Sequence, residues 1–167
     1  MATITLPANR VYNNDQNSPG ITAIADDKGC SLTCLLDIAN IFGPVSFTPA
    51  QISAACQWNA NGVGTWALPG NCSGSINHDA YTTNPGQAKV LQTVRAQVDA
   101  NNPVIVKMIN SVGEAHFVVA YGYTGSCSSL SEVQTLDPAG GRLRTLQEAV
   151  NYCHKTNVIS YIIGVRG

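Results

Sequence analysis

The hydrophobic pattern of this 167-residue chain changes its period once, near Pro103. Before that point, apolar residues recur at helical spacing. After it, runs of β-branched and aromatic residues are bounded by Gly, Ser, Asn and Pro, which is typical of strands. Helices that precede strands, instead of alternating with them, indicate an α+β fold with a mostly antiparallel sheet. The chain has no internal repeat and no low-complexity linker, so we expect a single domain over residues 1–167.

Three helices are expected in the first part of the chain. The segment CSLTCLLDIANIF carries apolar residues at i, i+3, i+4 and i+7, and Gly43–Pro44 ends it. Thr48 and Gln51 form a capping box that opens a second helix, which we expect to run to about Trp58. A third helix covers roughly 86–100. Two further segments are expected to be irregular: residues 7–29 and residues 59–84.

The second part of the chain predicts four strands and one short helix. The strands share β-branched and aromatic residues and cover 104–109, 116–123, 133–136 and 158–165. Thr145 and Glu148 cap a helix between the last two strands, and its Leu146, Val150 and Cys153 are expected to face inward. If the second and third strands pair as a hairpin, the start of one lies beside the end of the other.

Composition argues against two classes of function. The net charge is -1 and like charges do not cluster, which argues against nucleic-acid binding. No apolar run is long enough to span a membrane. Only 11% of the residues are charged. Asn, Gly, Ser and Thr therefore cover the surface, which suits a secreted or virion-associated protein, or a component of a larger assembly, better than a plain cytoplasmic one. The first residues, MATITLPANR, lack the apolar core of a secretory signal.

Six cysteines do not by themselves define a metal site or a disulfide framework. No spacing is CxxC, and the histidines and cysteines do not cluster at zinc-ligand spacing, so we expect neither a metal nor an organic cofactor. Cys34, Cys56 and Cys153 lie on apolar helical stripes, which is typical of small buried hydrophobic residues. Cys72 and Cys127 lie in segments rich in Gly and Ser, and the sequence is compatible with a disulfide bond involving either of them.

Cys30 is the strongest candidate for a reactive cysteine, because it follows Gly29 at the start of the most apolar helix. A helix N-terminus presents unpaired N–H groups and the positive end of the helix dipole, which favour a thiolate over a thiol. The preceding glycine lets the backbone approach a substrate closely. The alternative is a core cysteine at a helix start, and position alone does not favour the functional interpretation.

His116 and Asp137 complete a possible catalytic group. His116 opens the strand HFVVAYGY, and Asp137 ends the following strand just before Pro138. Taken singly, a surface histidine and a turn-forming aspartate are the ordinary interpretations. Pairing of the two strands brings both residues to one end of the sheet, where a carboxylate orients an imidazole. We therefore predict Cys30 as nucleophile, His116 as base and Asp137 as the residue that orients the base.

These residues stand in motifs that resemble a known family. GCSLTCLLDIANIFG resembles the nucleophile helix of papain-like cysteine peptidases, within them the bacteriocin-processing type (peptidase family 39-like) and its stand-alone relatives. FTPAQI resembles the next helix, NPVIVKMINSVGEAHFVVAYGY the pair of strands, and LDPAGG the element after them. The four motifs occur in the family's order, from about Gly29 to Gly141. The resemblance implies a cysteine peptidase or amide-bond hydrolase that forms an acyl-enzyme on Cys30.

The chain departs from the family's pattern in two respects. The family commonly has a glutamine upstream of the nucleophile that stabilises the oxyanion, and here no glutamine has the usual spacing. Gln16 is the first candidate and Asn13 the second, with the backbone N–H of Cys30 as the other donor. Loss of one such donor costs ~10²–10³ in rate. The transporter that often accompanies this peptidase is also missing, so export of a leader-bearing peptide is not implied.

Three functions are compatible with these features. The favoured one is a hydrolase of peptide or isopeptide bonds, with a peptide or protein substrate such as a cell-wall peptide. A papain-like domain without hydrolytic activity, used for binding or structure in a phage particle, is the second. The third is an acyl transferase of the transglutaminase type, which shares the triad. Trp58 and Trp66 are candidates for lining a substrate groove, although packing under the loop between them is favoured.

Overall fold

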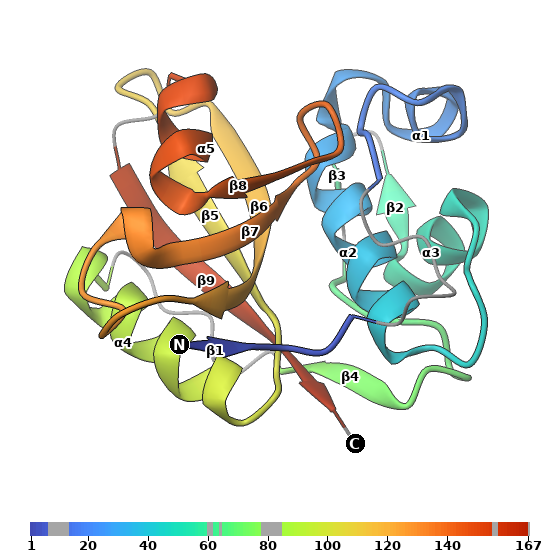
Figure 1. Cartoon of the computed structure of the whole chain (residues 1–167). Coiled ribbons are helices and arrows are strands. Elements are labelled where there is room, and N and C mark those ends of the chain that lie inside the picture. Colours follow the sequence, from blue (N-terminus) through green and yellow to red (C-terminus); the bar gives the residue numbers. More distant parts are fainter. Residues whose placement is uncertain (7–13, 60–61, 64, 78–84, 155–156, 167) are drawn as a thin grey trace.

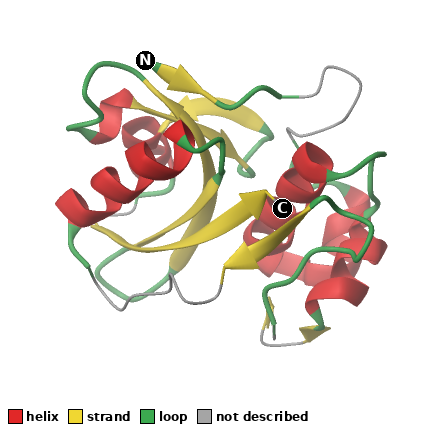
Figure 2. Cartoon of the chain, turned by 90° about the horizontal axis from the view of Figure 1, so that it is seen from below, coloured by secondary structure: helices red, strands yellow, loops and turns green. Residues whose placement is uncertain are grey.

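The structure of the chain is a computed structural model that describes residues 1–6, 14–59, 62–63, 65–77, 85–154 and 157–166. For residues 59, 62–63 and 157–166 it describes the backbone alone. Three helices gather at one side of the molecule (Figure 1): α1 (Pro19–Ala25), α2 (Gly29–Phe42) and α3 (Pro49–Cys56). A curled sheet forms the other side together with two helices, α4 (Gln87–Asp99) and α5 (Leu146–Tyr152). Figure 2 shows the strands running between these two groups of helices.

The main sheet has seven strands, and its described pairings are antiparallel. Six strands follow the order β4-β9-β5-β6-β7-β8, and β1 pairs with β6. Their bounds are β1 (Ala2–Thr3), β4 (Gly74–Asn77), β5 (Val104–Ile109), β6 (Ala115–Tyr123), β7 (Val133–Asp137), β8 (Arg142–Thr145) and β9 (Asn157–Arg166). A separate small sheet pairs β2 (Trp58–Asn59) with β3 (Gly62–Val63). The fold is α+β with a mostly antiparallel sheet, as the sequence predicts.

Helix α2 links the two sides of the molecule, because it packs against α1 and α3 and also against β6. Of its 14 residues, only Cys30 is not buried. The helix ends at Phe42, and the N–H of its C-cap, Gly43, donates to the Ala39 carbonyl oxygen at 2.6 Å. Among the described residues, no helix has both the length and the hydrophobicity that crossing a bilayer requires.

Most of the predicted helices and strands are confirmed, with small shifts in their bounds. Both capping boxes are present, at Thr48 with Gln51 and at Thr145 with Glu148. The two segments expected to be irregular contain further structure. Residues 7–29 include α1 and a 3₁₀ turn (Asp26–Lys28), and residues 59–84 include β3 and β4. Strand β4 pairs with β9, which is distant in the sequence. Its four residues are too few to show a hydrophobic period, so the sequence alone did not reveal the strand.

A tight turn after β7 positions the next strand at the site. Gly140 and Gly141 have φ angles of 83° and 57°, which glycine adopts without the steric cost of a side chain. The chain reverses there, and Arg142 of β8 pairs with Asp137 of β7. This strand was not predicted, because RLRT has little apolar character and its Leu143 is exposed.

Candidate active site

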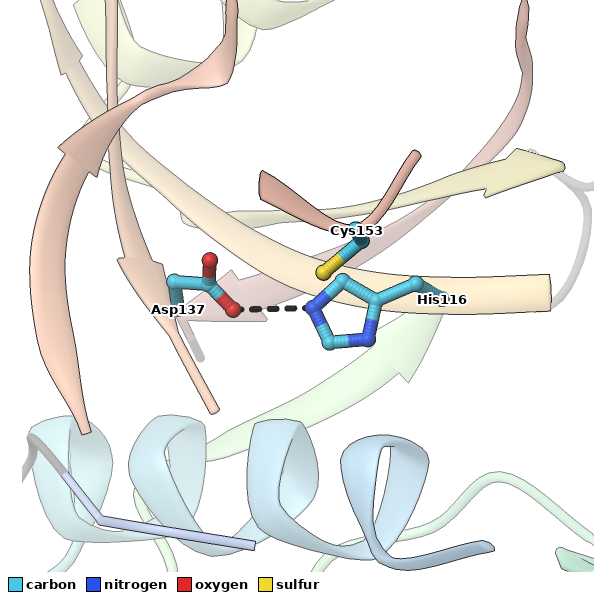
Figure 3. A group of neighbouring side chains, drawn as sticks. All are labelled: His116, Asp137 and Cys153. Atoms are coloured by element: carbon cyan, nitrogen blue, oxygen red, sulfur yellow. Dashed lines mark hydrogen bonds and ion pairs between the residues drawn. The ribbon is translucent and has the colours of Figure 1, made fainter. Parts of the chain in front are cut away.

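Asp137 and His116 meet across two neighbouring strands. Val119 of β6 pairs with Leu136 of β7, so Asp137 comes diagonally beside His116 on the same face of the sheet. His116 Nε2 donates a hydrogen bond to Asp137 Oδ1 at 2.8 Å (Figure 3). His116 is 5% exposed and Asp137 is 1% exposed. The bond at Nε2 leaves Nδ1 as the ring nitrogen that can serve a nucleophile.

Arg144 of β8 is a second partner of Asp137 that the sequence did not predict. Because Arg142 pairs with Asp137, Arg144 lies two residues along on the same face. Its Nη1 donates to Asp137 Oδ2 at 2.7 Å and to the Ala139 carbonyl oxygen at 2.8 Å. The Ala139 N–H donates to Asp137 Oδ1 at 2.9 Å. Both carboxylate oxygens are therefore bonded, and the carboxylate is held in one orientation.

Burial and hydrogen bonding shift the pKa values of His116 and Asp137 in opposite directions. Burial by itself lowers the pKa of His116, but hydrogen bonding with Asp137, Cys153 and Cys30 and the charge of Cys30 outweigh it and raise that pKa to about 11. Burial by itself raises the pKa of Asp137, but hydrogen bonds from His116, Ala139 and Arg144 lower it. At neutral pH the pair is therefore an imidazolium and a carboxylate.

Cys30 is the second residue of α2 and is half-buried. The contribution of its sulfur to the raised pKa of His116 places thiol and imidazole within reach of each other. In Figure 3, the second ring nitrogen of His116 points toward the pale blue helix α2. The unpaired N–H groups at the start of this helix favour a negative sulfur. The structure thus brings Cys30, His116 and Asp137 to one place, where α2 meets the sheet.

Gln16 lies where the N-terminal segment passes between α2 and the end of β7. Its N–H donates to the Pro138 carbonyl oxygen at 2.9 Å, and its Oε1 is buried without a hydrogen-bond partner. A Cβ on Gly29 would lie 3.0 Å from Gln16 O and 2.8 Å from Ile21 Cγ2. Glycine is therefore needed here for packing within the chain, and its role in letting a substrate approach stays a prediction. Asn13 lies outside the described residues.

Cys153 is a second thiol at the site: its side chain faces inward, as predicted, but the residue is not part of the buried core. Helix α5 ends at Tyr152, so Cys153 is its C-cap and leaves the apolar stripe. It is half-buried. Its Sγ, a ring nitrogen of His116 and a carboxylate oxygen of Asp137 all lie within 4.8 Å of one another (Figure 3). The contact depends on how α5 docks on the sheet, so no local sequence pattern could reveal it.

Of the remaining cysteines, Cys34 lies one turn after Cys30 on α2, where burial first and then the charges of Cys30, Asp37 and Asp137 raise its pKa. Cys34 and Cys56 are fully buried, as predicted. All six cysteines fall within the described residues and all are free thiols, so the disulfide considered for Cys72 or Cys127 is not formed. The sulfur of each of these two instead donates to a backbone carbonyl oxygen.

Trp58 and Trp66 are both partly buried and pack against the hydrophobic core. The ring of Trp66 contacts that of Phe117, with 5.4 Å between ring centroids. Phe117 follows His116 on β6, so its side chain faces the opposite side of the strand. The contact with Phe117 supports a packing role for Trp66. A role of either tryptophan in lining a substrate groove stays a prediction.

Comparison with known proteins gives one match to a family. No curated protein matches the chain. The model of the Peptidase C39 like family matches residues 9–161, a range that includes Cys30, His116 and Asp137. The match covers most of the chain and agrees with the α+β architecture described above. The chain therefore belongs to the Peptidase C39 like family of papain-like cysteine peptidases.

Proposed function

We propose that this protein is a thiol-dependent hydrolase of peptide or isopeptide bonds that works through an acyl-enzyme on Cys30. One observation carries the proposal. His116 lies between a cysteine at a helix N-terminus and a buried carboxylate whose two oxygens are both hydrogen-bonded. Membership of a family with a cysteine peptidase fold supports the same chemistry.

Acylation uses the thiolate and the imidazolium together. The Cys30 sulfur attacks the carbonyl carbon, and an electron pair of the C=O bond moves to the oxygen. When this intermediate collapses, the C–N bond breaks, and His116 Nδ1 gives its proton to the leaving amine. The product is a thioester on Cys30. Asp137 accepts the hydrogen bond from Nε2 throughout, which keeps the ring oriented and stabilises its positive charge.

Deacylation reverses the proton transfer. His116, now neutral, accepts a proton from water at Nδ1 while the water oxygen attacks the thioester carbon. The C–S bond then breaks, and the carboxylic acid product leaves the regenerated thiolate–imidazolium pair. An amine that attacks in place of water would give acyl transfer, so product analysis with and without an added amine separates the hydrolase from the transglutaminase-like alternative.

The oxyanion of both steps requires hydrogen-bond donors. The backbone N–H of Cys30 is one, because it lies in the first turn of α2, where N–H groups have no partner within the helix. We assign the second donor to Gln16. Its Oε1 is buried without a partner and the residue as a whole is half-buried, and we take the amide nitrogen as the donor.

The direct test compares Cys30→Ala with the matched control Cys72→Ala. Cys72 is also a half-buried free thiol but lies away from His116. With a mixture of peptides, including cell-wall peptides, as substrate and new amine termini as the readout, Cys30→Ala should lose at least ~10⁴-fold in rate. Cys72→Ala should keep the wild-type rate.

The same proteins can be treated with iodoacetamide. In the wild type, Cys30 should be alkylated much faster than Cys72, because the thiolate is the reacting form. Full hydrolytic activity in Cys30→Ala would rule the mechanism out. If the wild type cleaves nothing and Cys30 reacts no faster than Cys72, the papain-like module without hydrolytic activity replaces the hydrolase.

A further inference from the structure

The thiol of Cys153 has no role in the proposed hydrolysis, yet it lies beside the residues that drive it. Figure 3 shows its sulfur next to the edge of the His116 ring that faces Asp137. The ligand atoms of the three residues lie within 4.8 Å of one another. His116 and Asp137 are buried, and Cys153 is half-buried. Cys153 is therefore the least buried residue of the three.

We propose that Cys153, His116 and Asp137 form an inhibitory site for Zn²⁺ or a similar thiophilic divalent cation. Thiolate, imidazole and carboxylate are the three kinds of ligand that zinc takes from proteins. Cys153 and Asp137 are 16 residues apart along the chain, and His116 is a further 21 residues away. Ligand spacing in the sequence therefore does not reveal the site, and the folding of α5 onto the sheet assembles it.

The spacing of the ligand atoms fits tetrahedral zinc after a small adjustment. Zinc bonds of about 2.0–2.3 Å at tetrahedral angles place two ligand atoms roughly 3.3–3.6 Å apart. The 2.8 Å hydrogen bond between His116 Nε2 and Asp137 Oδ1 must open slightly. The Cys153 sulfur lies within 4.8 Å of both other ligand atoms, so it must move by no more than about 1.5 Å to reach the zinc spacing. The fourth position is left for water.

The charges and neighbouring contacts also fit a divalent cation. A thiolate and a carboxylate together balance the charge of Zn²⁺, and the imidazole binds as the neutral form. Arg144 holds Asp137 Oδ2 and so orients the carboxylate from behind, as outer partners of metal ligands do. The Arg144 guanidinium also lies 3.9 Å from the centroid of the Tyr152 ring, next to Cys153. The same side chain thus contacts one ligand, Asp137, and the residue that precedes another.

Binding at this site would stop catalysis without covering Cys30. The metal takes the place of the proton on His116 Nε2, and the thiol proton of Cys153 and that Nε2 proton pass to solvent. The neutral ring then carries its remaining proton on Nδ1. His116 can no longer accept a proton there, so it cannot act as the base for Cys30. Only this inhibition depends on the proposed hydrolase function, since metal binding itself does not.

Co²⁺ and Zn²⁺ binding test the site directly. The wild type and Cys30→Ala should each bind one Co²⁺ with a thiolate-to-metal charge-transfer band, and Zn²⁺ should displace it. Loss of an outer partner costs about 10–100-fold in metal affinity, so Cys153→Ala, which removes a direct ligand, should lose at least about 100-fold. Cys72→Ala is the control and should bind as the wild type does. Zn²⁺ should slow alkylation of Cys30 by iodoacetamide in the wild type and not in Cys153→Ala.

Two results would overturn the site. One is no charge-transfer band in the wild type. The other is a band that persists in Cys153→Ala but disappears in Cys30→Ala, which would place the metal on the nucleophile. If Cys153→Ala does not fold, Cys153→Ser keeps the size of the side chain and should still weaken binding. A protein that binds Zn²⁺ and cleaves no peptide contradicts only the hydrolase, and an active protein that binds no Zn²⁺ contradicts only this site.

Discussion

The two halves of the site differ in how completely their buried polar atoms are hydrogen-bonded. In the sheet half, formed by His116, Asp137 and Arg144, both carboxylate oxygens and the imidazole Nε2 have partners at 2.7–2.9 Å. The helix half is Gln16 together with helix α2, which Cys30 opens and in which Asp37 lies two turns further along, and two of its oxygens are buried without a partner. These are Gln16 Oε1 and Asp37 Oδ2.

Under the proposed mechanism, this difference separates the part of the site that must stay fixed from the part that must receive a substrate. A fully bonded buried network is rigid, and a general base needs a fixed orientation. A buried polar atom without a partner costs stability and marks a place where function outweighs that cost. We therefore expect substitutions in the sheet half to lower stability and rate together, and substitutions in the helix half to change one without the other.

The largest effect is expected for Asp137→Ala in the sheet half. The substitution leaves the half-buried Arg144 without its carboxylate, and breaking such a pair costs about 3–5 kcal/mol of unfolding free energy. The imidazole also loses the acceptor that orients it, so kcat/KM should fall by ~10³–10⁴-fold. Urea denaturation and hydrolysis kinetics on the same preparation measure the two losses.

Asp99→Ala is the matched control for this prediction. Asp99 lies on α4 and accepts a hydrogen bond from the Tyr123 hydroxyl at 2.7 Å, away from His116. This variant should lose only about 1 kcal/mol and keep the wild-type rate. If Asp137→Ala is destabilised but keeps its rate within about 10-fold, the sheet half is structural and the comparison of the two halves fails.

The next effect in size is expected for Gln16→Ala in the helix half. Removing an oxyanion donor should lower kcat by ~10²–10³-fold with little change in KM, because the interaction is made only in the transition state. The free energy of unfolding should stay the same or rise, because the substitution also removes the buried Oε1 that has no partner. Steady-state kinetics and urea denaturation together show the expected separation.

Two further variants sharpen this test. Gln16→Glu keeps the shape of the side chain but replaces the amide donor by a carboxylate, so kcat should fall at least as far as in Gln16→Ala. Asn17→Ala alters an exposed neighbour and should leave the rate unchanged. A loss of less than about 5-fold in Gln16→Ala would remove Gln16 from the oxyanion site.

The parts of the site that could be predicted are those with a local signal or a short connection. The apolar stripe of α2 and its Gly43 stop placed Cys30 at the start of a helix. The hairpin of β6 and β7 placed His116 beside Asp137, because only the connection 124–132 separates the two strands. In both cases neighbouring residues fix the geometry, and periodicity reveals them.

The parts that could not be predicted depend on docking between distant elements. Strand β8 carries little apolar pattern, although the Gly140–Gly141 pair is a hairpin signal from which the position of Arg144 could have been derived. Cys153 meets His116 only because α5 packs across β6, β7 and β8. Gln16 reaches Gly29 through a turn that includes α1, which was expected to be irregular.

The smallest effect, and the one that isolates the helix half, is expected for Asp37→Asn. Asp37 is 1% exposed, and its Oδ1 accepts from the backbone N–H and the side-chain Nδ2 of Asn14 at 3.2 and 2.6 Å. Burial raises the pKa of this carboxyl well above its ordinary value, and the bonds from Asn14 only partly oppose the change. The folded protein therefore keeps a proton that the unfolded chain releases above about pH 4.

The raised pKa of Asp37 makes its contribution to stability decrease as the pH rises. The contribution of Asp37 to stability is fully present below the pKa of the unfolded chain and falls as the pH rises toward the raised pKa of the folded state. Asn14 can still donate to the amide oxygen of Asp37→Asn, which carries no titrating proton. The variant should therefore gain about 1 kcal/mol or more over the wild type at pH 8 and little at pH 4. Urea denaturation at both pH values measures this difference, and Asp27→Asn at an exposed position should show none. A wild type that equals Asp37→Asn at pH 8 would mean that the buried carboxyl carries no cost, and the helix half would then be as well satisfied as the sheet half.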